Sequence, residues 1–282
     1  MRKVLLISSL VLVFLGGGLR AWWTKGHGTI AEAATGGLPE SMPAFFRAGG
    51  KHFAHLAAEP DQWKNRQTKF LYAAESPNHY LDFEYLEGNK LPPDRYQAIQ
   101  LMTRLHQKPD FTGMLPYAIM EEYERLAIAF SHQRAEPENE TIKMKCLVYA
   151  GILSHYTGDC MMPLHTTKDY DGKKNDKGGF SQKGIHAKID GFPEKNGFTA
   201  EEIGRGLLAE PKDDVWVYVQ QRIQESRTFI EKSYRLDAAG AFEKATPESR
   251  QFIMERCRAG AQFTMDMWLN AWLKSAKMPP SF

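Results

Sequence analysis

The chain of 282 residues has 43% hydrophobic and 25% charged residues, close to the globular average, which excludes a disordered, collagen-like or coiled-coil protein. Its formal charge is +2, but the first 21 residues hold three of the 36 basic residues and none of the 34 acidic ones, so the remainder is almost neutral. Overall basicity therefore gives no argument for a nucleic-acid or membrane partner, and any such partner must bind a local site.

The first 21 residues have the pattern of a secretory signal peptide. Two basic residues precede an apolar run over residues 4–15, and small residues follow it. The run is shorter than the roughly 20 apolar residues of a membrane span, so no stable span is expected once the signal is removed. We predict a signal at 1–21, export to the periplasm or the medium, and a mature domain over 22–282. Cleavage at that boundary makes Trp22 the N-terminus, although a cut after Gly18 also fits the small-residue rule.

The mature chain has the apolar periodicity of helices. Residues 138–156 and 248–274 repeat apolar side chains at spacings of three and four, the pattern of an amphipathic helix. Further helices are expected near residues 27–36, 42–58, 93–107, 114–132, 184–191 and 213–235. The alternation typical of strands is nearly absent, and turn-forming residues predict loops near 76–93 and 168–184. We therefore predict an all-α fold, a single multi-helix domain without repeats or a dividing linker.

Three cysteines leave two interpretations open. Cys146 and Cys160 are placed near opposite ends of one helix, about 21 Å apart at ~1.5 Å per residue, so they should not pair with each other. Export permits a disulfide from Cys257 to either of them. The alternative is that all three are small buried apolar side chains.

The segment His155-Tyr-Thr-Gly-Asp159 is the first chemically informative motif. Residues four apart share one face of a helix, so His155 and Asp159 can bind one ion. Pro163 should end that helix, because its nitrogen cannot donate to the helical ladder. His165 then follows on a loop, where it can reach the same ion or a neighbouring one.

A second pair, His186-Ala-Lys-Ile-Asp190, repeats the same spacing. A single His-x-x-x-Asp pair is usually an ion pair on a helix surface. Two such pairs joined by a further histidine indicate a metal centre instead. Imidazole nitrogens and carboxylate oxygens, without cysteine, suit zinc in a catalytic site that keeps an open position.

Four upstream residues complete a longer pattern: Trp22, His27, Asp61 and His79. The full order is Trp, His, Asp, His, His-x-x-x-Asp, His and His-x-x-x-Asp. In this order the chain resembles the superfamily that joins the single-strand-specific zinc nucleases of the S1/P1 type to the bacterial zinc-dependent phospholipases C. Members are all-helical exported phosphodiesterases with three zinc ions. The resemblance runs from Trp22 to about Asp190, and beyond it only the helical character matches.

The resemblance implies a trinuclear zinc cleft with three Zn²⁺ per chain. Its ligand sets would be Asp61, His79, His155 and Asp159; then His165, His186 and Asp190; and finally His27 with the amino group and carbonyl of Trp22, with Asp159 bridging the first and third ions. Zinc lowers the pKa of bound water to about 7, which supplies the attacking group for phosphodiester hydrolysis. Asp61 would orient or deprotonate that water. Lys64 would contact phosphate, its alternative role being a solvated helix charge.

The motifs favour a nuclease over a phospholipase. The five-residue step from Trp22 to His27 and the final carboxylate Asp190 resemble the nuclease branch, whereas the residues between His155 and Asp159 resemble the phospholipases. We predict a secreted zinc-dependent phosphodiesterase that hydrolyses single-stranded DNA or RNA, without a protein partner. The alternatives are a phospholipase C acting on phosphatidylcholine-like lipids and a non-catalytic exported zinc-binding protein.

The loop over residues 168–183 is the predicted substrate contact. It carries five lysines against three aspartates, a local excess of positive charge beside the proposed metals. Predicted substrate contacts are Lys173, Lys174 and Lys177 to the polyanionic backbone, and Tyr170 or Phe180 stacked on an unpaired base. The alternative is an ordinary solvated loop.

Overall fold

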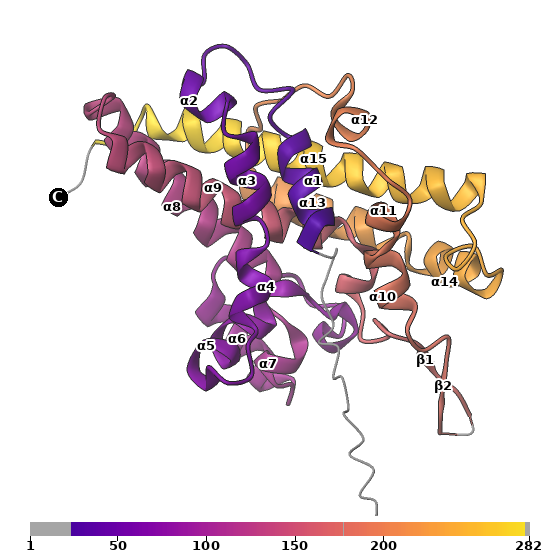
Figure 1. The fold of residues 1–282 in the computed structure, drawn as a ribbon. Helices are drawn as coiled ribbons and strands as arrows, with labels where there is room; N and C mark the ends of the chain where they lie inside the picture. The colour runs from indigo at the N-terminus through magenta and orange to yellow at the C-terminus, as the bar shows by residue number, and fades with distance from the viewer. Residues whose placement is uncertain (1–23, 177, 280–282) are drawn as a thin grey trace, which may run out of the picture.

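A computed structural model describes residues 24–176 and 178–279, and nearly all of its regular structure is helical (Figure 1). Three long helices form the centre: α8 (Leu115–Ala135), α9 (Glu140–Met161) and α15 (Pro247–Ser275), each packed against the other two. Helix α1 (Thr24–Ala33) packs against both α9 and α15, and α3 (Gly50–Leu56) packs against α9. The prediction of a single all-α domain is confirmed.

Shorter elements surround this centre (Figure 1). They are α2 (Ala44–Arg47), α4 (Glu59–Trp63), α5 (Lys69–Glu75), α6 (Arg95–Arg104), α7 (Pro109–Thr112), α10 (Ile185–Asp190), α11 (Phe192–Lys195), α12 (Ala200–Gly204), α13 (Val215–Arg227) and α14 (Ile230–Ala238), with the 3₁₀ turns η1 (Ser76–His79), η2 (Phe83–Leu86) and η3 (Pro163–Thr166). Two short strands, β1 (Lys173–Lys174) and β2 (Phe180–Ser181), form an antiparallel hairpin.

Helix α9 is the element around which the site is built. It begins where the Asn139 side chain accepts hydrogen bonds from two backbone amides of the first turn, 3.1 Å and 3.3 Å away. It ends at Met161, directly before the turn that starts at Pro163, as the proline predicted. From Ala150 to Met161 every residue is buried, so this half of the helix is covered on all sides. Polar side chains there need partners inside the protein.

A glycine lets α3 approach α9 at this point. A Cβ on Gly151 would lie 2.3 Å from Cβ of Leu56, far inside van der Waals contact. The close approach brings the carbonyl of Ala57, just after α3, to 2.7 Å from Nδ1 of His155. Packing of two helices therefore sets the orientation of one predicted ligand.

Two predicted helices are interrupted. The stretch 42–58 divides into α2 and α3 at a Gly49–Gly50 pair, because glycine has poor helix propensity. The stretch 213–235 divides into α13 and α14, where the hydroxyl of Thr228 donates to the carbonyl of Glu225, 2.6 Å away, in competition with the helical ladder. The predicted loops 76–93 and 168–184 contain 3₁₀ turns and the hairpin.

All three cysteines are free and buried, so the disulfide alternative is wrong and they serve as apolar core residues. Over residues 24–176 and 178–279, no helix combines the length and apolar character needed to cross a bilayer. The predicted signal at 1–21 lies outside the described residues and stays a prediction.

Candidate metal centre

Eight of the nine predicted ligands converge beside the C-terminal half of α9. The side chains come from six elements: His27 from α1, Asp61 from α4, His79 from η1, His155 and Asp159 from α9, His165 from η3, and His186 and Asp190 from α10. All eight are buried. They form three groups, and within each group the ligand atoms lie within 4.8 Å of one another. The ninth, Trp22, lies outside the described residues.

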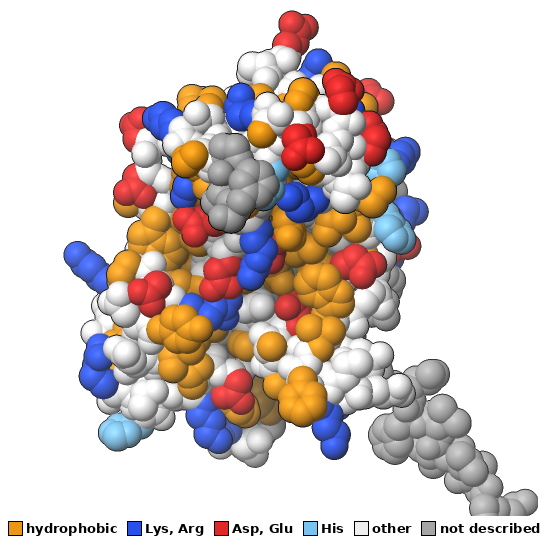
Figure 2. Space-filling view, turned by 90° about the vertical axis from the view of Figure 1, so that its left-hand side faces the viewer, with side chains coloured by type: hydrophobic (Ala, Val, Ile, Leu, Met, Phe, Trp, Pro, Cys, Tyr) orange, Lys and Arg blue, Asp and Glu red, His pale blue; other side chains and the backbone are white. Residues whose placement is uncertain are grey.

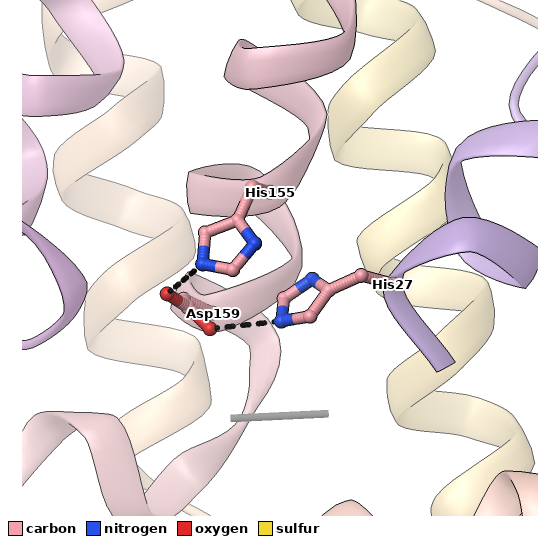
Figure 3. Close-up of side chains that lie close together, drawn as sticks. All are labelled: His27, His155 and Asp159. Atoms are coloured by element: carbon pink, nitrogen blue, oxygen red, sulfur yellow. Dashed lines mark ion pairs between the residues drawn. The ribbon is translucent and has the colours of Figure 1, made fainter. Parts of the chain in front are cut away.

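The first group joins α1 to α9 through Asp159 (Figure 3). Nε2 of His27 lies 3.3 Å from Oδ1 of Asp159, and Nε2 of His155 lies 3.2 Å from Oδ2. The two imidazole rings stack with their centroids 3.9 Å apart. Each oxygen of one carboxylate thus faces a different histidine, which is the arrangement of a bridging ligand.

The second group adds Asp61 and His79 to His155. Nδ1 of His79 lies 2.9 Å from Nε2 of His155 and 3.9 Å from Oδ1 of Asp61. The same His79 nitrogen is 2.9 Å from Oδ2 of Asp159. The first two groups are therefore in contact, and His155 belongs to both. Lys64 also reaches this group, with its ammonium 2.7 Å from Oδ1 of Asp61.

The third group contains His165, His186 and Asp190. Nε2 of His186 lies 3.0 Å from Oδ2 of Asp190, four residues on in α10. The rings of His165 and His186 stack at a centroid distance of 4.9 Å. His165 also approaches Asp159, with 3.7 Å between its Nδ1 and Oδ1 of that carboxylate, so this group borders on the first.

The outer nitrogens of three histidines are turned toward acceptors. Nδ1 of His155 faces the Ala57 carbonyl at 2.7 Å, and Nδ1 of His165 makes a short contact to the carbonyl of His79. Nε2 of His79 lies 3.3 Å from Oε1 of Glu75. If the opposite nitrogen of each ring binds a metal, the outer nitrogen carries the proton and donates to its acceptor. This is how metal-binding histidines are oriented in proteins.

The site has more electron-pair donors and more negative charge than its own residues can satisfy. Among the described residues, Nδ1 of His27, Nε2 of His165 and Oδ1 of Asp190 are buried without a hydrogen-bond partner. In the part of the chain that the structure describes, three carboxylates of the site are buried, and Lys64 is the one lysine or arginine paired with any of them, at Asp61. Buried excess charge is costly unless it is paired or binds a metal. The donor set therefore fits divalent cations.

Burial and neighbouring charge act in opposite directions on the two motif carboxylates. Burial alone would raise the pKa of Asp159, but His155 and then His165 outweigh it and hold that pKa well below its usual range. For Asp190 burial prevails over the attraction of His186 and raises the pKa to about 6. Burial lowers the pKa of His165 to about 3, which leaves that imidazole neutral and able to bind a metal.

Glu75 is a residue of this site that the sequence analysis missed. It is buried and accepts a short hydrogen bond from the hydroxyl of Tyr156, besides facing His79. The side-chain amide of Asn78 donates to its other oxygen at 3.3 Å, and Arg95 donates to the Asn78 oxygen at 3.0 Å. The signal was available, since Glu75 and His79 have the same four-residue spacing as the two His-Asp pairs.

The predicted substrate contacts have different surroundings. Tyr170 is half-exposed and its ring packs edge-on against His186, with centroids 5.9 Å apart, so it borders the third group. Phe180 on β2 is exposed. Lys173 turns to α14, with its ammonium 2.6 Å from Oε1 of Glu231, whereas Lys174 is exposed on the hairpin. Lys177 lies outside the described residues.

Comparison of the sequence with known protein families agrees with the assignment of these residues as a metal centre. The model of the S1/P1 nuclease family matches residues 22–188, which is more than half of the chain and includes every proposed ligand except Asp190. The chain belongs to the S1/P1 nuclease family. The resemblance inferred from the ligand order is thereby confirmed. No curated protein matches the sequence of this chain significantly.

Two solved structures show a distant likeness to the chain. One is the alpha-toxin of an avian strain of Clostridium perfringens, with 15% identity and a TM-score of 0.45. The other is the alpha toxin of Clostridium absonum, with 13% identity and a TM-score of 0.47. In both cases 90% of this chain is covered, and it spans 64% of the length of the toxin.

Proposed function

We propose that this member of the S1/P1 nuclease family is an exported zinc-dependent phosphodiesterase that hydrolyses single-stranded DNA or RNA. The observation that carries the proposal is the set of three buried His/Asp groups, of which the first two share His155 and all three approach Asp159. Nitrogen and oxygen donors without thiolate suit zinc at catalytic positions. Three Zn²⁺ per chain are proposed, the third completed by the amino group and carbonyl of Trp22 after signal removal.

The residues of the site have separate proposed roles. Bound zinc would supply a water of low pKa and neutralise the phosphate oxygens. Asp61 lies at the edge of the second group, where its carboxylate can orient the attacking water. Burial tends to raise the pKa of Asp61, but His155 and then Lys64 lower it, so the carboxylate stays ionised. Lys64 is the one cation among the described residues of the site, and its ammonium can contact a phosphate oxygen.

The deciding experiment uses mature protein that begins at Trp22 and carries no N-terminal tag. It is supplied with zinc and assayed in parallel on single-stranded DNA, duplex DNA, single-stranded RNA and phosphatidylcholine. We expect single strands to be cleaved in preference to duplex, because unpaired bases can stack on side chains and leave the backbone accessible. Elemental analysis should find three zinc ions. Release of diacylglycerol without any nuclease activity would contradict the proposal and favour a phospholipase C.

A further inference from the structure

A basic and aromatic strip adjoins the metal centre on the side of α5. The strip consists of residues 64–72, Lys-Asn-Arg-Gln-Thr-Lys-Phe-Leu-Tyr, with three cations and no acid. Lys64 pairs with Asp61 of the site. Arg66 and Lys69 are exposed, and within the described chain neither makes an ion pair or a side-chain hydrogen bond. Two cations therefore remain available to an anion from outside.

The same strip presents the most exposed large hydrophobic side chain of the described residues. Phe70 is 95% exposed, and Leu71 beside it is 43% exposed. Full burial of a phenylalanine is worth about 1.5–3 kcal/mol, so its exposure leaves that contribution unused. A single exposed hydrophobic residue is ordinary. Phe70 differs because two unpaired cations lie within the four residues before it and because its helix leads into the site.

The strip adjoins the metal centre at its first residue, and the helix that continues from its last residues returns to the centre at Glu75. Its first residue, Lys64, contacts Asp61. Helix α5 then runs from Lys69 to Glu75, whose carboxylate lies 3.3 Å from His79. At about 1.5 Å per residue, Phe70 is roughly 8 Å along the helix axis from Glu75. A polymer held by the strip would thus have its neighbouring units close to the metals.

Exposed aromatic side chains lie on the segment α5–α7 and on the hairpin loop. Among the described residues they are Phe70 on α5, Tyr96 on α6, Phe111 on α7, and Tyr170 and Phe180 in the hairpin loop. In Figure 1, α5–α7 lie at the lower left and the hairpin at the lower right. Figure 2 shows hydrophobic side chains beside Lys and Arg side chains at the lower end of the molecule. This combination fits a ligand that is both aromatic and anionic.

We propose that residues 64–72 bind the single strand beside the scissile phosphate, with Phe70 stacked on an unpaired base and Arg66 and Lys69 in contact with its phosphates. The proposal rests on the proposed function. Stacking needs only one accessible ring beside cations that follow the backbone. A membrane-binding helix needs a broad apolar face, whereas α5 has seven residues and its only exposed large hydrophobic side chains are the adjacent Phe70 and Leu71. Nucleic acid is therefore the better match.

The test compares long and short substrates in the zinc-loaded mature enzyme. For an oligonucleotide of about 12 bases, Phe70→Ala should raise KM about 5- to 100-fold, the equivalent of one lost base stack. Phe70→Trp should retain most of the wild-type KM. Hydrolysis of a dinucleotide, which has no base beyond the two that flank the scissile phosphate, should be unchanged in both variants. Leu208→Ala is the matched control, because Leu208 is also exposed, at 70%, but lies beyond α12.

The cations are tested by salt dependence. Replacing both Arg66 and Lys69 by Gln should make the slope of log binding constant against log salt shallower by about 1.4, or about 0.7 per lost phosphate contact on a single strand. Binding is measured by fluorescence anisotropy with a phosphorothioate oligonucleotide, which does not depend on hydrolysis. Zinc content should equal that of the wild type in every variant of the strip.

The outcomes separate the two proposals. If the wild type cleaves single strands and Phe70→Ala leaves KM and binding unchanged, the strip has no role in binding and only this inference is overturned. If the variant loses binding to phosphatidylserine vesicles but not to the oligonucleotide, the strip is a lipid-binding surface. If the wild type cleaves no nucleic acid while Phe70→Ala still weakens oligonucleotide binding, the strip is supported and the proposed function is wrong.

Discussion

The two His-x-x-x-Asp pairs have the same spacing and different surroundings. Four histidines lie within 4 Å of the carboxylate of Asp159: His27, His79, His155 and His165. The carboxylate of Asp190 has one histidine at that distance, His186 of its own helix. The carboxylate of the first pair thus contacts histidines from three other elements, whereas that of the second contacts only the histidine of its own helix.

The difference appears in the charge of the two carboxylates. Both are buried, which by itself raises a carboxyl pKa. Histidines outweigh that effect at Asp159 and lower its pKa, whereas at Asp190 burial prevails and raises the pKa to about 6. A four-residue spacing thus determines which side chains share a helix face. The number of donors that the fold brings to that face determines whether the carboxylate is held ionised.

The largest expected effect distinguishes these two carboxylates. Asp159→Asn should lose more than one zinc and reduce hydrolysis by more than about 100-fold, since residues that merely orient a ligand are worth about 10- to 100-fold. Asp190→Asn should lose one zinc and keep the others. Zinc per chain is measured by elemental analysis beside turnover. Equal zinc loss in both variants would contradict the bridging role of Asp159.

The next effect concerns the carboxylate that faces His79. Glu75→Gln should weaken zinc binding about 10- to 100-fold in a competition titration with a chelator, because a neutral amide holds the His79 ring less firmly. Asp266→Asn is the control, since Asp266 is a buried carboxylate that accepts from Tyr218 at 2.6 Å and touches no proposed ligand. The zinc affinity of the Asp266→Asn variant should stay within twofold of that of the wild type. A similar loss in both variants would indicate a general effect of removing buried charge.

A smaller effect is expected at the helix contact that orients His155. Gly151→Ala would place a methyl group against Leu56 and push α3 from α9, at a cost of about 1–3 kcal/mol in the free energy of unfolding. Urea unfolding measures this cost. The control is Gly36→Ala, because a Cβ on Gly36 would meet only a backbone oxygen, 3.6 Å away. Gly206→Ala is unsuitable, because Gly206 has a φ of 72°, which strains any other residue. An unchanged free energy in Gly151→Ala would show that the helices can separate freely.

The smallest effect is on the pH dependence of stability in zinc-free protein. The folded pKa of Asp190 is raised to about 6 from 3.8, so the folded state binds this proton more tightly than the unfolded chain does. The stabilisation is complete below pH 4 and is lost as the pH rises to about 6. Asp159 has the opposite sign, because its pKa is lowered: its contribution is present above pH 4 and is lost on acidification.

Urea titrations at pH 4 to 7 in the presence of a chelator measure this dependence. Subtracting the Asp190→Asn profile from that of the wild type should isolate a decline between pH 4 and 6. A difference that instead rises with pH would mean that Asp190 is held ionised like Asp159, and the contrast between the pairs would disappear.

Helical periodicity and ligand order were readable without the structure. Pro163 was predicted from a local rule to end α9, and the two long predicted helices agree with α9 and α15 within a few residues. The order of the nine ligand candidates, Trp22 included, also led to the family, because each motif lies on a short stretch of chain. Interruptions such as that at Thr228 were not predicted, since a side-chain hydrogen bond competes there with a helix of normal composition.

Tertiary structure decided which partners each of these residues has. The sequence by itself determined the helices, the four-residue pairs and the family, because those depend on local spacing and on the types of donor present. Only the fold decided that Asp159 gathers four histidines while Asp190 keeps one, that Glu75 stands behind His79, and that Lys173 pairs with Glu231. Such contacts join residues from separate elements, and their geometry depends on how the helices pack, for example on how closely Gly151 lets α3 approach α9.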